Sequence, residues 1–339
     1  MSPAGDKEGT ESMTSLVTGS AGHLGEALVR TLRAGGEDVV GLDLLDSPFT
    51  DLRGSVADRA CARRALRGVA TVYHAAALHK PHVATHSRQD FVDTNITGTL
   101  NLLEEAVAAG VERFVFTSTT SVFGDALVPP PGAPAAWISE EVAPVAKNIY
   151  GVTKAAAEDL CQLFHRRFAL PVIVLRTSRF FPEPDDSKAL RAAYADGNVK
   201  ANEFLSRRAD IADVVSAHLC AAECAADIGF GRYIVSATTP FLPEDLAELR
   251  CDAPAALARR APAFRDLYER LGWHMFPQVD RVYVNAKARR ELGWQPQYDF
   301  DRVLESLAAG ADPRSPLARA VGAKGYHAEA FSEGPYPVE

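Results

Sequence analysis

The sequence predicts an α/β protein, in which a doubly wound parallel sheet is followed by a smaller C-terminal lobe. Three observations lead to this prediction. Short apolar runs alternate with longer helix-like segments through roughly the first two-thirds of the chain, which is the order of a parallel sheet with crossover helices. The first apolar run ends in a glycine-rich turn that opens a helix. From Pro240 onward the segments are short and helical, as expected of a second lobe.

The individual elements follow from the spacing of the apolar residues. Leu24, Leu28 and Leu32 recur every four residues, which predicts a helix over His23–Ala34 with one apolar face. Apolar runs bounded by turn residues predict strands at Ser15–Thr18, Asp38–Leu42, Val69–His74, Val111–Ser118, Pro171–Arg176 and Arg232–Val235. Longer segments predict helices over Phe91–Ala109, Tyr150–Phe168 and Ala209–Ala226.

Composition excludes several classes of function. The 339 residues carry a formal net charge of -8, and no Lys/Arg cluster exceeds a pair, which argues against a nucleic-acid partner. The five cysteines are scattered without zinc-finger spacing, so no metal site is predicted. No apolar run approaches membrane-spanning length and the N-terminus lacks the apolar core of a signal peptide. We therefore expect a cytoplasmic protein with a small-molecule partner and no membrane partner.

The glycine turn has the spacing of a dinucleotide site. Gly19, Gly22 and Gly25 follow one another at intervals of three residues between a predicted strand and a predicted helix. Glycine permits the tight turn and lets the backbone approach a pyrophosphate, which the helix N-terminus then faces. Asp43 ends the next predicted strand, 18 residues after Gly25 (43 − 25), where a carboxylate binds the adenosine ribose. Because Leu44 and Leu45 supply no cation for a 2′-phosphate, NAD is predicted rather than NADP.

Tyr150 and Lys154 form a candidate acid–base pair. They lie four residues apart at the start of a predicted helix and therefore share one face. A free tyrosine, with a pKa of about 10, is a poor base at neutral pH. A neighbouring lysine and a positively charged nicotinamide ring favour the phenolate and bring it into a useful range.

With these motifs in place, the chain resembles an extended short-chain dehydrogenase/reductase of the NAD-dependent epimerase/dehydratase family. The resemblance covers roughly residues 14–310. Besides the glycine turn, it rests on His74–Ala77, Asn95–Thr99, Ser118–Gly124, Tyr150–Lys154 and Lys287–Trp294. It implies a Rossmann domain over residues 13–177, to which residues 205–236 return. Residues 178–204 and 237–311 would form the substrate-binding lobe, between a disordered tail at 1–12 and a C-terminal tail at 312–339.

The resemblance also implies the roles of individual residues. Thr119 matches the hydroxyl that binds the reacting oxygen, Tyr150 the general acid/base, and Lys154 the residue that holds the nicotinamide ribose. The expected cofactor-binding residues are Gly19, Ala21, Gly22, His23, Leu24, Gly25, Asp43, Ser55, Val56, Ala75, Ala76, Ala77, Asn95, Thr117, Tyr150 and Lys154. The expected substrate-binding residues are His79, Thr119, Thr120 and Arg179.

Two of these substrate residues have alternative interpretations. His79 is equally compatible with a surface-loop histidine. Arg179, which stands where family epimerases usually carry asparagine, could bind a substrate carboxylate or phosphate, or form a salt bridge to Glu183 or Asp185. Phe181-Pro182 and the short stretch from Arg176 to Asp213 also depart from the nucleotide-sugar enzymes.

The residues after Thr119 narrow the reaction. In this family, 4,6-dehydratases carry an Asp-Glu pair there, whereas this chain has Thr120 and Ser121. We therefore expect an NAD-dependent epimerase acting on a sugar, nucleotide- or phosphate-activated, through a transient keto intermediate. The alternatives are a dehydrogenase or reductase of a non-nucleotide alcohol or carbonyl and, from another class, a non-catalytic dinucleotide sensor.

A homodimer is also expected. It would form through the two long helices, which carry apolar residues beyond those needed by one sheet face: Leu100, Leu103, Val107, Leu160 and Leu163.

Overall fold

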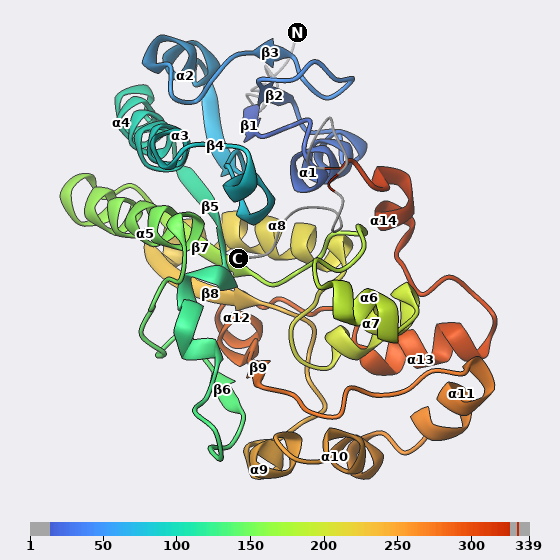
Figure 1. Cartoon of the computed structure of the whole chain (residues 1–339). Coiled ribbons are helices and arrows are strands. Elements are labelled where there is room, and N and C mark those ends of the chain that lie inside the picture. The colour runs from blue at the N-terminus through green and yellow to red at the C-terminus, as the bar shows by residue number, and fades with distance from the viewer. Residues whose placement is uncertain (1–13, 326–330, 332–339) are drawn as a thin grey trace, which may run out of the picture.

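The computed structural model describes residues 14–325 and 331, so the expected tail at residues 1–12 lies outside the described residues. The centre is a seven-stranded parallel sheet in the order β3-β2-β1-β4-β5-β7-β8 (Figure 1). The strand order reverses between β1 and β4, which confirms the doubly wound fold class. The strands span Thr14–Thr18 (β1), Val39–Asp43 (β2), Leu52–Arg53 (β3), Val69–His74 (β4), Arg113–Thr119 (β5), Val172–Thr177 (β7) and Phe230–Val235 (β8).

Helices cover both faces of this sheet because successive side chains of a strand point to opposite faces. Val17 of β1 packs in one apolar cluster with α1 (His23–Ala34) and α8 (Ile211–Ile228). Leu16, the residue before it, packs in the other cluster. That second layer consists of α2 (Arg59–Ala65), α4 (Gly98–Ala109) and α5 (Ile149–Phe168).

The helix expected over Phe91–Ala109 is not continuous. It begins as α3 (Arg88–Phe91), widens into a π-helical turn over Val92–Thr97 and resumes as α4. Within this turn the Asn95 carbonyl accepts a hydrogen bond from Thr99 Oγ1 at 2.7 Å. Insertions of this kind in a helix are frequent at functional sites, and local propensity does not predict them.

A second apolar core lies outside the sheet domain. Its main helices are α7 (Asp196–Phe204), α10 (Ala253–Arg260), α11 (Phe264–Leu271) and α13 (Phe300–Ala308). A two-stranded parallel sheet, which the sequence did not predict, joins β6 (Ala136–Ile138) to β9 (Arg281–Tyr283). The shorter helices span Lys188–Ala193 (α6), Leu246–Leu249 (α9) and Ala286–Glu291 (α12). Short 3₁₀ segments span Lys80–Ala84 (η1), Thr120–Leu127 (η3) and Pro243–Asp245 (η4).

The segment expected as a C-terminal tail contains a helix, α14 (Pro316–Val321). Its apolar residues Leu317, Ala318 and Val321 pack against the cluster around α1 and α8. The Ser315 backbone N–H donates to Asp210 Oδ2 at 3.0 Å, which ties α14 to the start of α8. In the part of the chain that the structure describes, no helix combines the length and apolarity required to cross a bilayer.

Candidate active site

The turn between β1 and α1 is built for close approach. Gly19 has φ +74°, and a Cβ there would lie 2.8 Å from the Ala76 backbone nitrogen. A Cβ on Gly25 would lie 1.9 Å from the Gly19 carbonyl oxygen, so helix and turn touch backbone to backbone. Gly22, the N-cap of α1, provides no side-chain hydrogen bond to the helix N-terminus. A cradle with an uncapped helix N-terminus fits a pyrophosphate, which the backbone N–H groups of His23 and Leu24 would face.

Asp43 ends β2 next to this turn. Its Oδ2 accepts a hydrogen bond from the Ala21 backbone N–H at 2.9 Å, and its Oδ1 accepts one from the Leu45 N–H at 2.9 Å. Two backbone donors therefore hold the carboxylate beside the glycine turn, at the position that the sequence assigned to the adenosine ribose.

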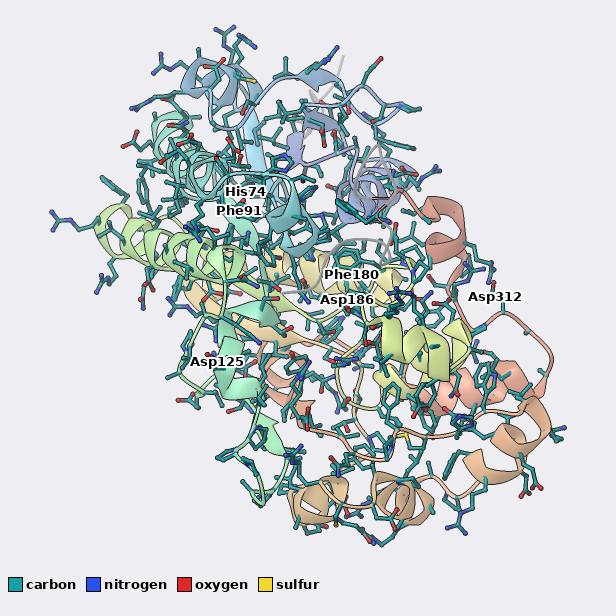
Figure 2. All side chains as sticks on the ribbon, in the orientation of Figure 1. His74, Phe91, Asp125, Phe180, Asp186 and Asp312 are labelled. Atoms are coloured by element: carbon teal, nitrogen blue, oxygen red, sulfur yellow. The ribbon has the colours of Figure 1, made fainter. Side chains whose placement is uncertain are left out.

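A buried chain of hydrogen bonds supports the opposite wall, where Ala75–Ala77 follow β4. The Ala76 N–H donates to Thr18 Oγ1 at 3.1 Å, and Thr18 donates to His74 Nδ1 at 2.7 Å. His74 Nε2 donates in turn to Thr99 Oγ1 at 3.0 Å. Burial lowers the pKa of His74 well below its usual value, so the ring stays neutral. Because Thr99 Oγ1 donates its only hydrogen to the Asn95 carbonyl, it must accept from His74 Nε2, and this fixes the donor order. Figure 2 labels His74 among the strand ends.

The expected reaction centre is brought together by the fold. Thr119 ends β5, and Tyr150 lies in the first turn of α5, which Asn148 caps by accepting from the Gly151 N–H at 3.1 Å. The Thr119 side chain lies close enough to the Tyr150 hydroxyl to act on its pKa, and Thr119 Oγ1 accepts a hydrogen bond from the Ser121 N–H at 3.1 Å. Lys154 is 2% exposed, and its Nζ lies 3.9 Å from the centre of the Phe116 ring.

Burial dominates the electrostatics of this pair. It raises the pKa of Tyr150 to about 12, although the nearby Thr119 side chain acts in the opposite direction. Burial also lowers the pKa of Lys154 to about 7, against the raising effects of Cys161 and Glu158. The charge state of Lys154 therefore changes near neutral pH, which is useful in a site that moves protons.

Comparison with known proteins decides the family. The sequence model of the NAD-dependent epimerase/dehydratase family matches residues 15–234, well over half of the chain. The chain belongs to this family. Family enzymes of this type are extended short-chain dehydrogenase/reductases, and the cofactor is NAD, which is bound in structural neighbours of this chain.

Curated relatives match parts of the chain. It is 36% identical over 135 residues to UDP-glucose 4-epimerase from Erwinia amylovora, covering 34% of this chain and 40% of the relative. It is 43% identical over 133 residues to sterol demethylase protein B from Methylococcus capsulatus, covering 36% and 38%. The matched segments thus span about two fifths of the length of these relatives.

Solved structures match over nearly their full length. A short-chain dehydrogenase/reductase superfamily protein from Agrobacterium tumefaciens, solved with bound NAD, superposes with a TM-score of 0.62 at 26% identity, covering 91% of this chain and 99% of that one. MoeE5 in complex with UDP-glucose and NAD gives a TM-score of 0.60 at 26% identity, covering 87% and 96%.

Other predicted cofactor residues have structural partners. The Asn95 side chain, 1% exposed, bonds both backbone groups of Leu78 and Thr153 Oγ1, so it fixes the loop after β4 to α5. Thr117 Oγ1 lies 2.8 Å from His218 Nε2 on α8. The carbonyl of Val56 accepts from Asn101 Nδ2 at 3.2 Å, which holds Ser55–Val56 against α4.

The predicted substrate residues differ in their surroundings. Thr120 follows Thr119 and is 7% exposed. The His79 ring stacks on Phe181 with a centroid separation of 5.7 Å. Arg179 is bound by carboxylates: it pairs with Asp185, with Asp186 at 2.8 Å and with Glu203 at 3.1 Å. The salt-bridge interpretation of Arg179 thus has its partner in Asp185, one of the two that the sequence suggested.

Sequence reasoning missed the contacts that connect the loop after β7 to α1 and η1. His23 Nε2 lies 2.8 Å from Glu183 Oε1, and Lys80 Nζ lies 2.6 Å from Asp186 Oδ2. Figure 2 labels Asp186 beside Phe180, between the sheet domain and helices α6 and α7. These pairs are separated by more than a hundred positions (183 − 23 = 160 and 186 − 80 = 106), so no local pattern could reveal them.

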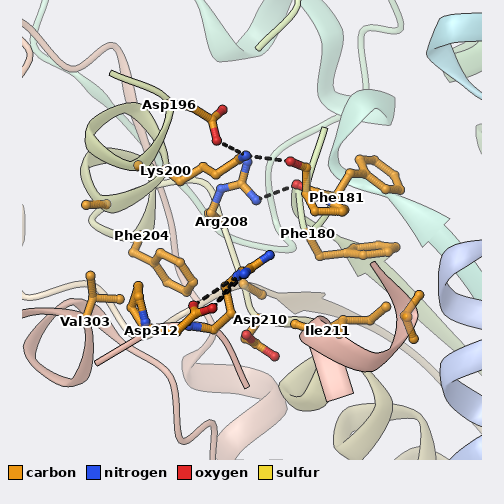
Figure 3. A pocket seen from close by; sticks show the side chains of 18 of the residues that line it. Phe180, Phe181, Asp196, Lys200, Phe204, Arg208, Asp210, Ile211, Val303 and Asp312 are labelled. Atoms are coloured by element: carbon orange, nitrogen blue, oxygen red, sulfur yellow. Dashed lines mark hydrogen bonds and ion pairs between the residues drawn. The ribbon is translucent and has the colours of Figure 1, made fainter. Parts of the chain in front are cut away.

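An apolar cavity of about 380 Å³ adjoins this loop (Figure 3). Phe180, Phe181, Phe204 and Ile211 line it, together with residues of α13 and α14. Within the wall, Lys200 pairs with Asp196 and Arg314 with Asp312, and the Arg208 side chain pairs with Glu203 behind it. Among the described residues, no group of three or more His, Cys, Asp or Glu side chains is arranged to hold a metal ion.

Proposed function

We propose that this protein is an NAD-dependent epimerase that acts on a nucleotide- or phosphate-activated sugar by transient oxidation to a keto intermediate and re-reduction. The observation that carries the proposal is the proximity of the Thr119 and Tyr150 side chains, with Lys154 buried one turn further along α5. Thr120 and Ser121 follow Thr119, so the acid pair that family dehydratases use for water elimination is missing from this position.

The proposed chemistry assigns one task to each residue. Tyr150 takes the proton of the substrate hydroxyl in the oxidation and returns it in the reduction. Thr119 donates a hydrogen bond to the same oxygen as it becomes a carbonyl. Lys154 holds the nicotinamide ribose and, when protonated, favours the phenolate of Tyr150. NAD, when bound in the Gly19–Gly25 cradle, supplies the hydride acceptor.

A group of arginines supports an anionic substrate. Glu203 is fully buried and pairs with both Arg179 and Arg207. Burial lowers the pKa of Arg207. The charges of Glu203 and Asp185 oppose this effect, whereas the charges of Arg281 and Arg179 add to it. The Nε of Arg281 is buried and has no hydrogen-bond partner among the described residues. A phosphate or carboxylate of the substrate would supply the missing partner of the Arg281 Nε.

The test is incubation of the purified protein with a panel of sugars, sugar phosphates and nucleotide sugars. An epimerase converts one of them into its epimer, which NMR detects, without net accumulation of NADH. Accumulation of NADH in proportion to product would refute epimerisation.

The apolar cavity favours a second candidate, an NAD-dependent dehydrogenase of a non-nucleotide alcohol. Its wall is largely apolar and its charges are internally paired, so it suits an uncharged hydrophobic group rather than a phosphate. The partial match to sterol demethylase protein B points in the same direction. Under this alternative, hydrophobic alcohols are oxidised with stoichiometric NADH while no sugar of the panel is epimerised.

A further inference from the structure

The carboxylate of Glu158 joins the two elements that carry the reaction centre. Glu158 lies one turn beyond Lys154 on α5 and is 2% exposed. Its Oε1 accepts a hydrogen bond from Ser118 Oγ at 2.6 Å. Ser118 immediately precedes Thr119 at the end of β5, so one side chain connects the helix of Tyr150 to the strand of Thr119.

Two arginines complete the arrangement. Arg176 of β7 donates from Nε to Glu158 Oε1 at 3.0 Å and from Nη2 to Oε2 at 2.7 Å. Arg232 of β8 donates from Nε to Oε2 at 3.0 Å. Ser118 and Arg176 are opposite each other in the sheet register, and the Arg176 side chain is 4% exposed. The Glu158 carboxylate thus fastens α5 to three neighbouring strands, and a buried carboxylate persists only when it is paired in this way.

Glu158 is also the negative charge nearest in sequence to Lys154. Burial lowers the pKa of Lys154 to about 7, and Cys161 and Glu158 oppose this effect. Burial raises the pKa of the Cys161 thiol far above neutrality, so Cys161 is uncharged there. The neutral His74 faces Lys154 from β4, while Arg176 and Arg232 lie against Glu158. Among these groups, Glu158 alone favours the protonated lysine at neutral pH.

We propose that Glu158 is a positioning residue of this enzyme: it holds α5 against the ends of β5 and β7, so that Thr119 and Tyr150 stay close together and Lys154 has a compensating charge beside it. The inference rests on the proposed function only in taking Thr119, Tyr150 and Lys154 as the reaction centre. It assigns Glu158, Ser118 and Arg176 a role that the sequence motifs did not include.

The test uses NADH as the probe, because its binding requires no knowledge of the substrate. NADH affinity is measured by fluorescence across pH for the wild type, Glu158→Gln and Asp159→Asn. Affinity of the wild type is expected to fall as pH rises through about 7, where Lys154 loses its charge. In Glu158→Gln, which removes the charge but keeps the size, the fall moves to lower pH.

Asp159→Asn is the matched control, because Asp159 is the next residue, pairs only with Arg232 among the ion pairs of the described residues, and has a side chain 79% exposed. Its profile is expected to coincide with that of the wild type. Glu158→Asp, which keeps the charge but shortens the side chain, should keep the wild-type profile while turnover falls by about a hundredfold, the scale of an ångström-sized misplacement. A Glu158→Gln profile that superimposes on the wild type overturns the proposal.

If Glu158→Gln does not fold, Ser118→Ala provides the second test, since it removes only the bond to the strand end. A crystal structure of Ser118→Ala is expected to show a longer distance between Thr119 Oγ1 and Tyr150 Oη than in the wild type. An unchanged distance refutes the positioning role. Wild-type protein that turns over no member of the substrate panel would refute the proposed function, while the NADH measurements would still test Glu158.

Discussion

Replacing Asp43 with asparagine is expected to narrow the preference of the enzyme for NAD over NADP. Both carboxylate oxygens of Asp43 accept backbone N–H groups, from Ala21 and Leu45, so the charge is fixed in place beside the glycine turn. A 2′-phosphate on the adenosine ribose would therefore meet a carboxylate that cannot turn away.

The size of the effect follows from Coulomb's law. Two unit charges 4 Å apart repel by about 4 kcal/mol at an effective dielectric constant near 20 and by about 1 kcal/mol in water. Asp43 is half-buried, and an intermediate value of roughly 2–3 kcal/mol corresponds to about a hundredfold difference in affinity. Arg53 stands opposite Asp43 in the register of β2 and β3, and its Nε donates to the Leu44 carbonyl at 3.1 Å. This cation attracts a 2′-phosphate and reduces the discrimination.

Calorimetric titration with both cofactors measures the ratio of the two affinities. Asp43→Asn should reduce the ratio, and Leu44→Arg, at a side chain 59% exposed, should reduce it further. Arg53→Ala is the control of opposite sign, since it should widen the preference. The ratio of the NAD and NADP affinities is the quantity to compare. In Asp43→Asn one carboxylate oxygen becomes an NH₂ group, which cannot accept from the Ala21 or Leu45 N–H, and this loss weakens the binding of both cofactors alike. Equal affinities of the wild type for NAD and NADP would refute the role of Asp43.

Three further predictions concern catalysis, stability and assembly. Tyr150→Phe should lower turnover by about 10²–10⁴-fold with nearly unchanged NAD affinity, because it removes only the proton carrier; kinetics and calorimetry test this, and substantial residual activity would identify another base. Burial lowers the pKa of His218 from 6.5 to about 4, so as the pH falls the unfolded state takes up a proton on this ring before the folded state does. The free energy of unfolding should therefore decrease as the pH falls from 6.5 to about 4, by about 3 kcal/mol in total. Denaturant titration at several pH values should show a smaller decrease in the free energy of unfolding for His218→Gln than for the wild type. The same pH dependence in both proteins would refute the assignment. A homodimer through α4 and α5 is expected by light scattering, and a monomer at micromolar concentration would contradict it.

The sheet could be predicted from sequence because its signals are local. Val69–His74 is a strand with the predicted bounds, and the strands around it differ from prediction by a few residues at each end. A parallel sheet buried on both faces requires continuous apolar runs, and such runs are legible in a single sequence. The glycine turn and the Tyr150–Lys154 pair could be predicted as well, because each motif lies within a few consecutive residues.

The dimer prediction shows where local reasoning loses accuracy. Leu103 was counted among the surplus apolar residues, yet it is fully buried in the core beneath the sheet. Leu163 is 40% exposed, and Val152 and Phe168 of the same helix are 49% and 56% exposed. Helical periodicity gives the relative positions of these side chains, but it does not say which part of the apolar face the sheet covers. The π-helical turn at Val92–Thr97 also rotates α4 relative to a regular helix that begins at Phe91.

Residues that set specificity were the hardest to assign because their partners are distant in sequence. Arg179 had two interpretations from its neighbours alone, and the structure adds Glu203, which lies on helix α7. Glu203 in turn is shared with Arg207, so an anion arriving at this group meets arginines whose charge is already partly neutralised. In the proposed function, the chemistry depends on short motifs at the strand ends, whereas substrate choice depends on how the loop after β7 and helix α7 pack together. The first is therefore legible in the sequence, and the second requires the fold.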